Sequence, residues 1–209
     1  MDLTHQNLCK LAVEWLQRPS SRKGPGCVVA VSETQNAINN EIPDAIGWRP
    51  YRHGGCGATV VEVKVSRADF LADAGKPHRQ APELGMGAYR YYMAPVDLIS
   101  EADLPPRWGL IEVTERGHIK VRCGHVFASN CRPEELDNQW RHEQFNVQAE
   151  ISLLALALAR VGDPQKFQGM LREAGNRASR LDKEVVQLRE RIRVLENEKH
   201  ALIRKELAF

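Results

Sequence analysis

The sequence lacks the long apolar segments that mark membrane-spanning and secreted proteins. Its longest apolar run, residues 151–159, contains Ser152 and is much shorter than the ~18 residues that a membrane-spanning helix needs. The first ten residues, MDLTHQNLCK, lack the basic start and apolar middle of a signal peptide. We therefore expect a cytoplasmic protein without a membrane span.

An excess of charge of one sign is also missing. The 29 Lys and Arg residues are nearly balanced by 27 Asp and Glu residues, which gives a formal net charge of +2. A chain with 43% hydrophobic residues and balanced charge is neither disordered nor suited to coating nucleic acid by bulk charge. The sequence also has no glycine-rich phosphate loop and no Gly-x-Ser-x-Gly nucleophile motif.

The five cysteines are odd in number and scattered, which predicts reduced thiols rather than a disulfide framework. One local group, Cys123, His125 and Cys131, has the residue types of half a zinc site. Its spacing matches no common zinc finger or ribbon. Thiols in strands and loops are therefore the favoured interpretation.

Glycine and proline are scarce beyond Gly162-Asp163-Pro164, a stop-and-turn signal that divides the chain in two. We predict a globular domain over residues 1–161 and one long helix over residues 165–209. Residues 166–209 hold 11 Lys and Arg against 7 Asp and Glu, whereas the rest of the chain holds 18 against 20. The positive charge therefore belongs to the C-terminal segment, and the globular part is slightly acidic.

The C-terminal segment carries a heptad repeat. Its a positions are Val185, Ile192 and Lys199, and its d positions are Leu181, Leu188, Leu195 and Leu202. β-Branched residues at a and leucine at d favour a parallel two-stranded coiled coil. Three pairs of opposite charge would then face each other between the helices: Arg177 with Asp182, Glu184 with Arg189, and Arg191 with Glu196. We expect a homodimer or a coiled-coil partner protein. The alternatives are an amphipathic helix packed on the globular domain and, more weakly, a basic DNA-binding helix.

Hydrophobic periodicity predicts an α/β protein with a mixed sheet and helices on its faces. We expect helices over residues 7–17, with Thr4 as the N-cap, over residues 67–73 and over residues 146–161. We expect strands over residues 27–32, 42–48, 58–66, 88–94, 108–113 and 118–122.

Charged residues interrupt the strand with the strongest β signal, ATVVEVKVS at residues 58–66. Alternation places Glu62 and Lys64 on one face of this strand, and burying such charges is costly unless they are paired or bound to a metal. Asp44 lies on the neighbouring predicted strand. Two carboxylates, with the carbonyl of Val63, suit Mg²⁺ or Mn²⁺. Such a metal activates water at a scissile phosphate, and Lys64 could orient that water or stabilise the developing charge.

The pattern Pro43-Asp44 followed by Glu62-Val63-Lys64 resembles the PD-(D/E)XK nuclease superfamily. The segments PDAIGW, VEVKVSRADFLAD, GMGAYRYYMAP, WGLIEV and GHIKVR look like the MmcB-like DNA repair family and related prophage proteins. The likeness spans residues 3–126 and excludes the coiled coil. It implies a restriction-endonuclease-like fold and metal-dependent cleavage of DNA.

The resemblance also assigns roles to individual residues. Carried over by position, Asp44 and Glu62 are metal ligands and Lys64 is the catalytic lysine. Superfamily members place an acidic residue on the first helix near the metal, and Glu14 is the candidate here. Its alternative role is that of a solvated helix residue. We expect Mg²⁺ or Mn²⁺ as the cofactor and DNA as the partner.

Basic residues near the expected active edge are candidates for DNA contacts. Arg49 and Arg52 lie in the loop WRPYRH, and Arg67 opens the following helix. Residues 76–92 combine basic side chains with tyrosines and flexible glycines, which suits contacts with phosphates and bases. The candidates in this segment are Lys76, His78, Arg79 and Arg90. Alternatively, the tyrosines pack within the sheet and the cations are only solvated.

Two functions compete on the sequence alone. The first is a metal-dependent endo- or exodeoxyribonuclease that acts in DNA repair, phage replication or defence. The second is a catalytically inactive nuclease-fold scaffold that binds DNA or protein and recruits a partner through its coiled coil.

Overall fold

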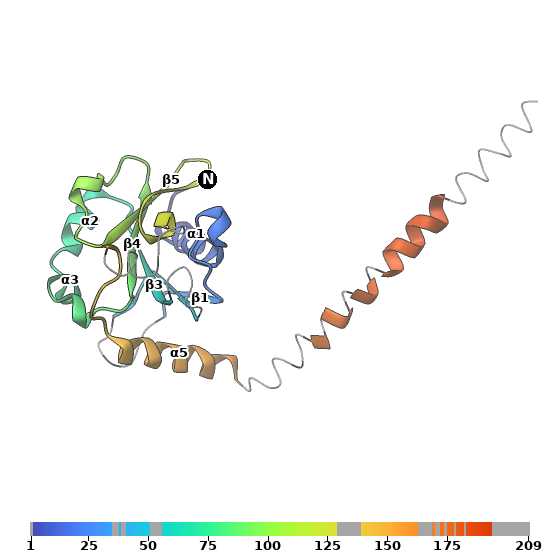
Figure 1. Ribbon diagram of the computed structural model, residues 1–209. Coiled ribbons are helices and arrows are strands. Elements are labelled where there is room, and N and C mark those ends of the chain that lie inside the picture. Colours follow the sequence, from blue (N-terminus) through green and yellow to red (C-terminus); the bar gives the residue numbers. More distant parts are fainter. Residues whose placement is uncertain are drawn as a thin grey trace, which may run out of the picture. The chain divides into compact units, whose positions relative to one another are not determined.

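The computed structural model describes residues 2–34, 38, 41–50, 56–128 and 139–162, together with helical residues at 169, 172–173, 175–177, 179–181 and 183–193. The chain divides into two compact units, Met1–Ala157 and Leu158–Phe209. Figure 1 shows the first unit as a sheet with helices on its faces. Within the described ranges, no helix combines the length and the apolarity that crossing a membrane would require.

A six-stranded mixed sheet forms the centre of the first unit, in the order β1-β2-β3-β4-β5-β6. The strands are β1 (Val29–Ser32), β2 (Ala45–Arg49), β3 (Gly57–Val63), β4 (Tyr89–Pro95), β5 (Trp108–Val113) and β6 (Ile119–Cys123). Strands β1 to β3 pair antiparallel, β3 to β5 pair parallel, and β6 returns antiparallel to β5. The predicted α/β class with a mixed sheet is confirmed.

The helices of the first unit lie against both faces of this sheet (Figure 1). Those in the described part of the chain are α1 (His5–Gln17), α2 (Arg67–Asp73), α3 (Pro77–Gln80) and α5 (Val147–Val161), with short 3-10 turns at Ser20–Arg22, Pro82–Leu84, Glu101–Asp103 and His125–Ala128. Thr4 caps α1 as predicted, because its side chain accepts the Asn7 N–H at 3.3 Å. A hydroxyl at this position satisfies one of the free N–H groups of the first turn.

Strand β3 shows how the two faces of the sheet differ. Val61 and Val63 join an apolar core with residues of α1, which includes Trp15. The alternate residues Val60 and Glu62 point to the opposite face. There Val60 packs with residues of α5, whereas Glu62 meets Arg79 of α3 and Lys76, which lies between α2 and α3.

Two element boundaries differ from the expectation in ways that affect the candidate site. Strand β2 begins at Ala45, so Asp44 precedes the strand instead of lying within it. Strand β3 ends at Val63, because Ser66 caps α2 only three residues later by accepting the Asp69 N–H. Helix α1 also begins two residues earlier than predicted, and this places His5 in its first turn.

The second unit is helical at the C-terminal residues that the structure describes. Four heptad positions, Leu181, Val185, Leu188 and Ile192, have exposed side chains, with exposures of 52%, 43%, 56% and 54%. The further heptad positions Leu195, Lys199 and Leu202 lie outside the described residues. A C-terminal helix is therefore present, and the coiled coil stays a prediction.

Candidate functional site

Glu62 and Lys64 lie on one face of the sheet at the end of β3, as alternation predicts. Each side chain is only 3% exposed, and Lys64 Nζ lies 3.9 Å from Glu62 Oε2. Charged groups this deeply buried need strong partners to offset the loss of hydration. Helices α2 and α3, which follow β3 directly in the chain, supply those partners.

Asp73, in the last turn of α2, is the centre of this arrangement. Its carboxylate lies 3.0 Å from Lys64 Nζ, 2.7 Å from Lys76 Nζ and 2.6 Å from Arg79 Nε, and it accepts the Tyr92 hydroxyl at 2.7 Å. Burial alone would raise the pKa of Asp73. The charge of Arg79 and the hydrogen bonds from Arg79, Lys76 and Tyr92 outweigh burial, so the pKa lies well below its ordinary value.

Glu62 shares two of the same cations. Its Oε2 atom lies 3.1 Å from Arg79 Nη2 and 3.5 Å from Lys76 Nζ. We call the five residues Glu62, Lys64, Asp73, Lys76 and Arg79 the ionic cluster. Its three cations face two buried carboxylates, and the exposed carboxylate of Asp69, 3.7 Å from Lys64 Nζ, balances the third charge.

Asp44 completes the predicted triad but turns toward α1. Its Oδ2 atom accepts the Val63 N–H at 2.7 Å, and its Oδ1 atom lies 3.1 Å from His5 Nε2. The pKa of Asp44 is raised to about 6, chiefly by burial and also by the negative charge of Glu62. The Val63 N–H, His5 and Lys64 act in the opposite direction. The pKa of Asp44 thus depends on the charges of both Glu62 and Lys64, although the His5 contact of Asp44 is made with α1.

His5 and Cys9 of α1 form a second donor group around Asp44. Cys9 Sγ lies 3.5 Å from His5 Nδ1, and one ligand atom from each of the three residues falls within 4.8 Å of the others. Burial raises the pKa of the Cys9 thiol to about 12, with the charge of Asp44 adding to the effect. Nitrogen, sulfur and oxygen donors suit Zn²⁺ better than Mg²⁺.

Sequence reasoning missed His5 and Asp73. The His5–Cys9 pair was recognisable in principle, because residues four apart share one face of a helix. The predicted helix began at residue 7, however, and so left His5 out. Asp73 stands at the end of the predicted helix 67–73, but nothing local showed that this turn reaches Lys64.

The prediction for Glu14 is not supported by its position. Its side chain is exposed. Nine residues separate it from His5, and at 100° per residue this places the two on opposite sides of α1. His5 therefore takes the place near Asp44 that the sequence assigned to Glu14, and Glu14 matches the alternative of a solvated helix residue.

Four of the predicted DNA-contacting residues already have protein partners. Lys76 and Arg79 belong to the ionic cluster. Arg67 pairs at 2.8 Å with Asp103 on the surface. Arg49 donates from Nη1 to the carbonyl of Pro25 at 2.7 Å. Arg52 lies outside the described residues, and for His78 the structure describes the backbone in α3 but not the side chain.

Arg90 is a correction, because the structure gives it a role within the fold. Its side chain is buried, and its guanidinium donates to the carbonyls of Pro82, Gly85, Met86 and Gly87 at 2.6–3.2 Å. A guanidinium bound to backbone in this way holds the turn before β4. It is not presented to a DNA backbone on the surface.

In the group Cys123, His125 and Cys131, the structure shows His125 packed against aromatic side chains. The His125 ring stacks on Tyr89 with centroids 3.9 Å apart, and one ring nitrogen lies 2.9 Å from the Tyr91 hydroxyl. Burial lowers the pKa of His125 to about 3. Cys123 is partly buried, and Cys131 lies outside the described residues. His125 therefore acts as a neutral core residue, and the tyrosine packing expected as an alternative is present.

Comparison with known proteins bears on the fold alone. No protein-family model and no curated protein matches the chain. A similar solved structure is the SPO1766 protein of unknown function from Silicibacter pomeroyi, with a TM-score of 0.50 and 19% sequence identity. The alignment covers 79% of this chain and 96% of that chain.

Proposed function

We propose that this protein is a metal-dependent deoxyribonuclease that hydrolyses phosphodiester bonds, in DNA repair, phage replication or defence. The main support is the placement of the buried carboxylate of Glu62 and the partly buried carboxylate of Asp44 at adjacent ends of neighbouring strands. Ala45 pairs with Val61 in the antiparallel β2–β3 register, so one further step sets Asp44 opposite Glu62. A buried lysine, Lys64, lies on the same side as Glu62.

The chemistry of these donors fits a divalent cation. The charge of Glu62 raises the pKa of Asp44, and a cation between the two would relieve their repulsion. Asp44 and Glu62 would hold Mg²⁺ or Mn²⁺, which supplies charge neutralisation at the phosphate and an activated water when bound. His5, whose Nε2 atom lies 3.1 Å from Asp44 Oδ1, would be a further ligand of this cation.

The chain's own residues would prepare the phosphate for attack. Asp73 holds the Lys64 ammonium in place, because its carboxylate lies 3.0 Å from Nζ. A fixed ammonium stabilises negative charge on a phosphate without reorganising during the reaction. The Val63 N–H bond fixes the orientation of the Asp44 carboxylate.

Cleavage assays with matched variants test this proposal. Purified protein is incubated with single-stranded, duplex and branched DNA in Mg²⁺ or Mn²⁺, and with EDTA as the metal-free control. We expect Asp44→Asn, Glu62→Gln and Lys64→Met to lower the cleavage rate at least about a hundredfold, the usual cost of losing an electrostatic stabiliser. Lys120→Met, at an exposed position of β6, is the control and should cleave like the wild type. No cleavage by the wild type, or equal cleavage by Lys64→Met, would contradict the proposal.

A second candidate function is the inactive scaffold. It is favoured because the charged groups of the ionic cluster are already paired with one another. Lys64 is 3% exposed and its ammonium is already engaged by Asp73. If the cluster is only structural, DNA or protein binding should survive Glu62→Gln, and no DNA should be cleaved. Binding that requires a divalent metal and Glu62 would count against the scaffold.

The coiled-coil homodimer is a proposal that serves either function. Its support is the exposed row of Leu181, Val185, Leu188 and Ile192. We expect the full chain to sediment as a dimer and Leu188→Glu to sediment as a monomer, because a charge at d removes the apolar seam. Lys183→Glu, at an outward f position of the heptad, is the matched control and should stay dimeric. A monomeric wild type would rule out the homodimer.

A further inference from the structure

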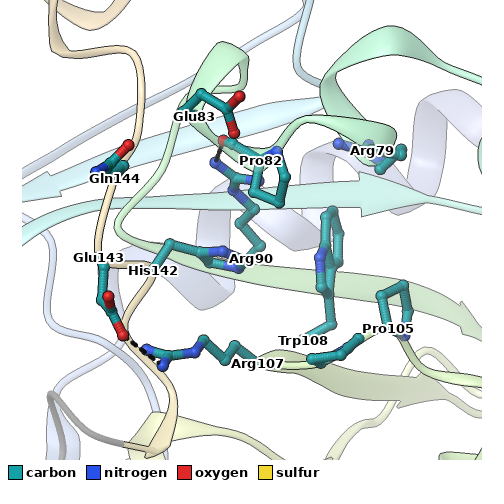
Figure 2. Close-up of a pocket in the computed structure, with 11 residues that line it drawn as sticks. Arg79, Pro82, Glu83, Arg90, Pro105, Arg107, Trp108, His142, Glu143 and Gln144 are labelled. Carbon is teal, nitrogen blue, oxygen red and sulfur yellow. Dashed lines mark hydrogen bonds and ion pairs between the residues drawn. The ribbon is translucent and has the colours of Figure 1, made fainter.

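A cavity of about 330 Å³ lies next to the ionic cluster. Arg79 belongs to both, since it lines the cavity and also contacts Glu62 and Asp73. Figure 2 shows the lining: His142 points toward Arg90, and Arg107 extends from the side of Trp108 toward Glu143. The volume is at the lower end of those found for small-molecule sites.

His142 brings an unpartnered polar atom to this cavity. The residue is 6% exposed, and its Nε2 atom is buried without a hydrogen-bond partner among the described residues. Arg79 Nη2, also buried, makes an ion pair with Glu62 at 3.1 Å but has no well-directed hydrogen bond within the described part of the chain. Buried polar groups in native proteins are almost always satisfied, so the unpartnered Nε2 atom of His142 points to a missing hydrogen-bond partner in the cavity.

The electrostatic environment of His142 favours a negative ligand. Its pKa is lowered to about 3, chiefly by burial and also by the positive charges of Arg90, Arg107 and Arg79. Three guanidinium groups therefore act on this imidazole, and they outnumber the two carboxylates of the lining, Glu83 and Glu143. An anion in the cavity would be attracted by this excess of positive charge and could accept from His142 and Arg79.

Arg107 offers a guanidinium that a ligand could capture. Its Nη2 atom pairs at 2.8 Å with Glu143, whose side chain is 81% exposed, while Nη1 donates to the carbonyl of Arg141. An exposed carboxylate is easily displaced, because a surface ion pair contributes little stability. Arg107 also has a left-handed backbone with φ of 68°, a conformation that non-glycine residues adopt rarely and often near functional sites.

The remaining walls suit the non-ionic part of a nucleotide. Pro82, Pro105 and Pro106 line the cavity with apolar surface, and Trp108 lies beneath Arg79 with the guanidinium 4.5 Å from the ring centroid. A free oxyanion would leave these walls uncovered. A phosphate attached to a sugar would fill both the cationic and the apolar parts.

We infer that this cavity binds the terminal phosphate of a DNA strand, with His142, Arg79 and Arg107 as the phosphate contacts. The inference rests on the proposed function, because it places a strand end next to Glu62 and Lys64. The cavity would then position a terminal nucleotide and favour substrates with a phosphorylated end.

Binding measurements without cleavage test the inference. Fluorescence anisotropy in EDTA compares a 5′-phosphorylated oligonucleotide with the same strand lacking the phosphate, and a 3′-phosphorylated strand is measured alongside. We expect one phosphorylated end to bind roughly ten-fold more tightly, as hydrogen bonds to a charged group would provide. Arg107→Gln and His142→Gln should each remove this preference. Arg122→Gln, which removes the same charge outside the cavity lining, should retain it.

A second measurement reports on His142 directly. In protein with ¹⁵N-labelled histidine, the resonance that disappears in His142→Gln is assigned to His142. Titration with the phosphorylated strand should shift this resonance, and thymidine 5′-monophosphate and inorganic phosphate serve as smaller probes. Thermal unfolding of each variant shows that it is folded.

Three outcomes would overturn the inference: no preference for a phosphorylated end, a preference that survives both cavity substitutions, or a shift of His142 with the mononucleotide but not with the strand. The last outcome would assign the cavity to a free nucleotide. Strong phosphate-dependent binding without cleavage in Mg²⁺ or Mn²⁺ would support the inference while contradicting the nuclease proposal, so the two failures can be told apart.

Discussion

The two faces of strand β3 are built from opposite kinds of residue. Toward α1, Val61 and Val63 pack with Trp15 and Tyr91 in a continuous apolar core. Toward α2 and α3, Glu62 and Lys64 are equally buried but bind charged partners. Apolar packing explains the first face fully. Burying the charged residues of the second face costs hydration free energy, and hydrophobic residues at the same positions would avoid this cost. The charges therefore point to a function beyond stability.

Trp15→Ala tests the apolar face and should have the largest effect on stability. Trp15 is fully buried, contacts Tyr91 with ring centroids 4.9 Å apart, and donates from Nε1 to the carbonyl of Lys23 at 2.9 Å. We expect the free energy of unfolding to fall by about 4 kcal/mol, the range for a large aromatic residue truncated in a core. Urea denaturation measures the change, and a loss below about 1 kcal/mol would show that this face is loosely packed.

Asp73→Asn tests the charged face and should cost slightly less. Removing the central carboxylate leaves Lys64 and Arg79 with only Glu62 as a buried counter-ion. We expect a loss of about 3 kcal/mol, as found when one partner of a buried ion pair is removed. Asp69→Asn is the matched control, because Asp69 is 43% exposed and lies 3.7 Å from Lys64. Its loss should stay below about 1 kcal/mol, and equal losses in the two variants would contradict a central role for Asp73.

Glu150→Gln should have the smallest effect, and the effect should depend on pH. Glu150 accepts the Gly87 N–H at 2.8 Å, and burial raises its pKa from 4.5 to about 7. The folded protein therefore binds this proton more tightly than the unfolded chain, and wild-type stability falls as pH rises from about 4.5 to 7. The variant lacks this loss and should be more stable by about 2 kcal/mol at pH 8, after allowance for a weaker amide hydrogen bond.

Thermal unfolding of Glu150→Gln and wild type between pH 4 and pH 8 measures this difference. The stability difference between the variant and the wild type should be smallest at pH 4, increase through pH 6 and level off above pH 7. A difference that is independent of pH would show that Glu150 acts only through its shape and hydrogen bond.

Local sequence patterns predicted most of the fold. Alternation in β3 placed Glu62 and Lys64 correctly on one face, and the Thr4 cap and the order of helices and strands followed from residue types alone. Errors occurred at element ends, where capping decides the boundary. Ser66 ends the extended segment after Val63, and the earlier start of α1 brings His5 into the first turn.

The partners of the charged residues were harder to predict. That Asp73 binds Lys64, and that Arg90 binds four carbonyls, depends on how α2, α3 and the turn before β4 fold back on the sheet. A basic residue near tyrosines looks the same in sequence whether it contacts DNA or backbone. Arg90 was therefore assigned to DNA, and only its burial distinguishes the two roles.

The short spacing of the ionic cluster along the chain has a consequence for folding. Lys64 and Asp73 are nine residues apart, and Asp73 and Tyr92 are nineteen apart, whereas the contact between Gly87 and Glu150 closes a loop of 63 residues. Closing a short loop loses less chain entropy, so contacts between near neighbours can form early. The segment from β3 to β4 can thus assemble its charged face before α5 docks. In a pulsed hydrogen-exchange experiment its amides should be protected ahead of those of α5.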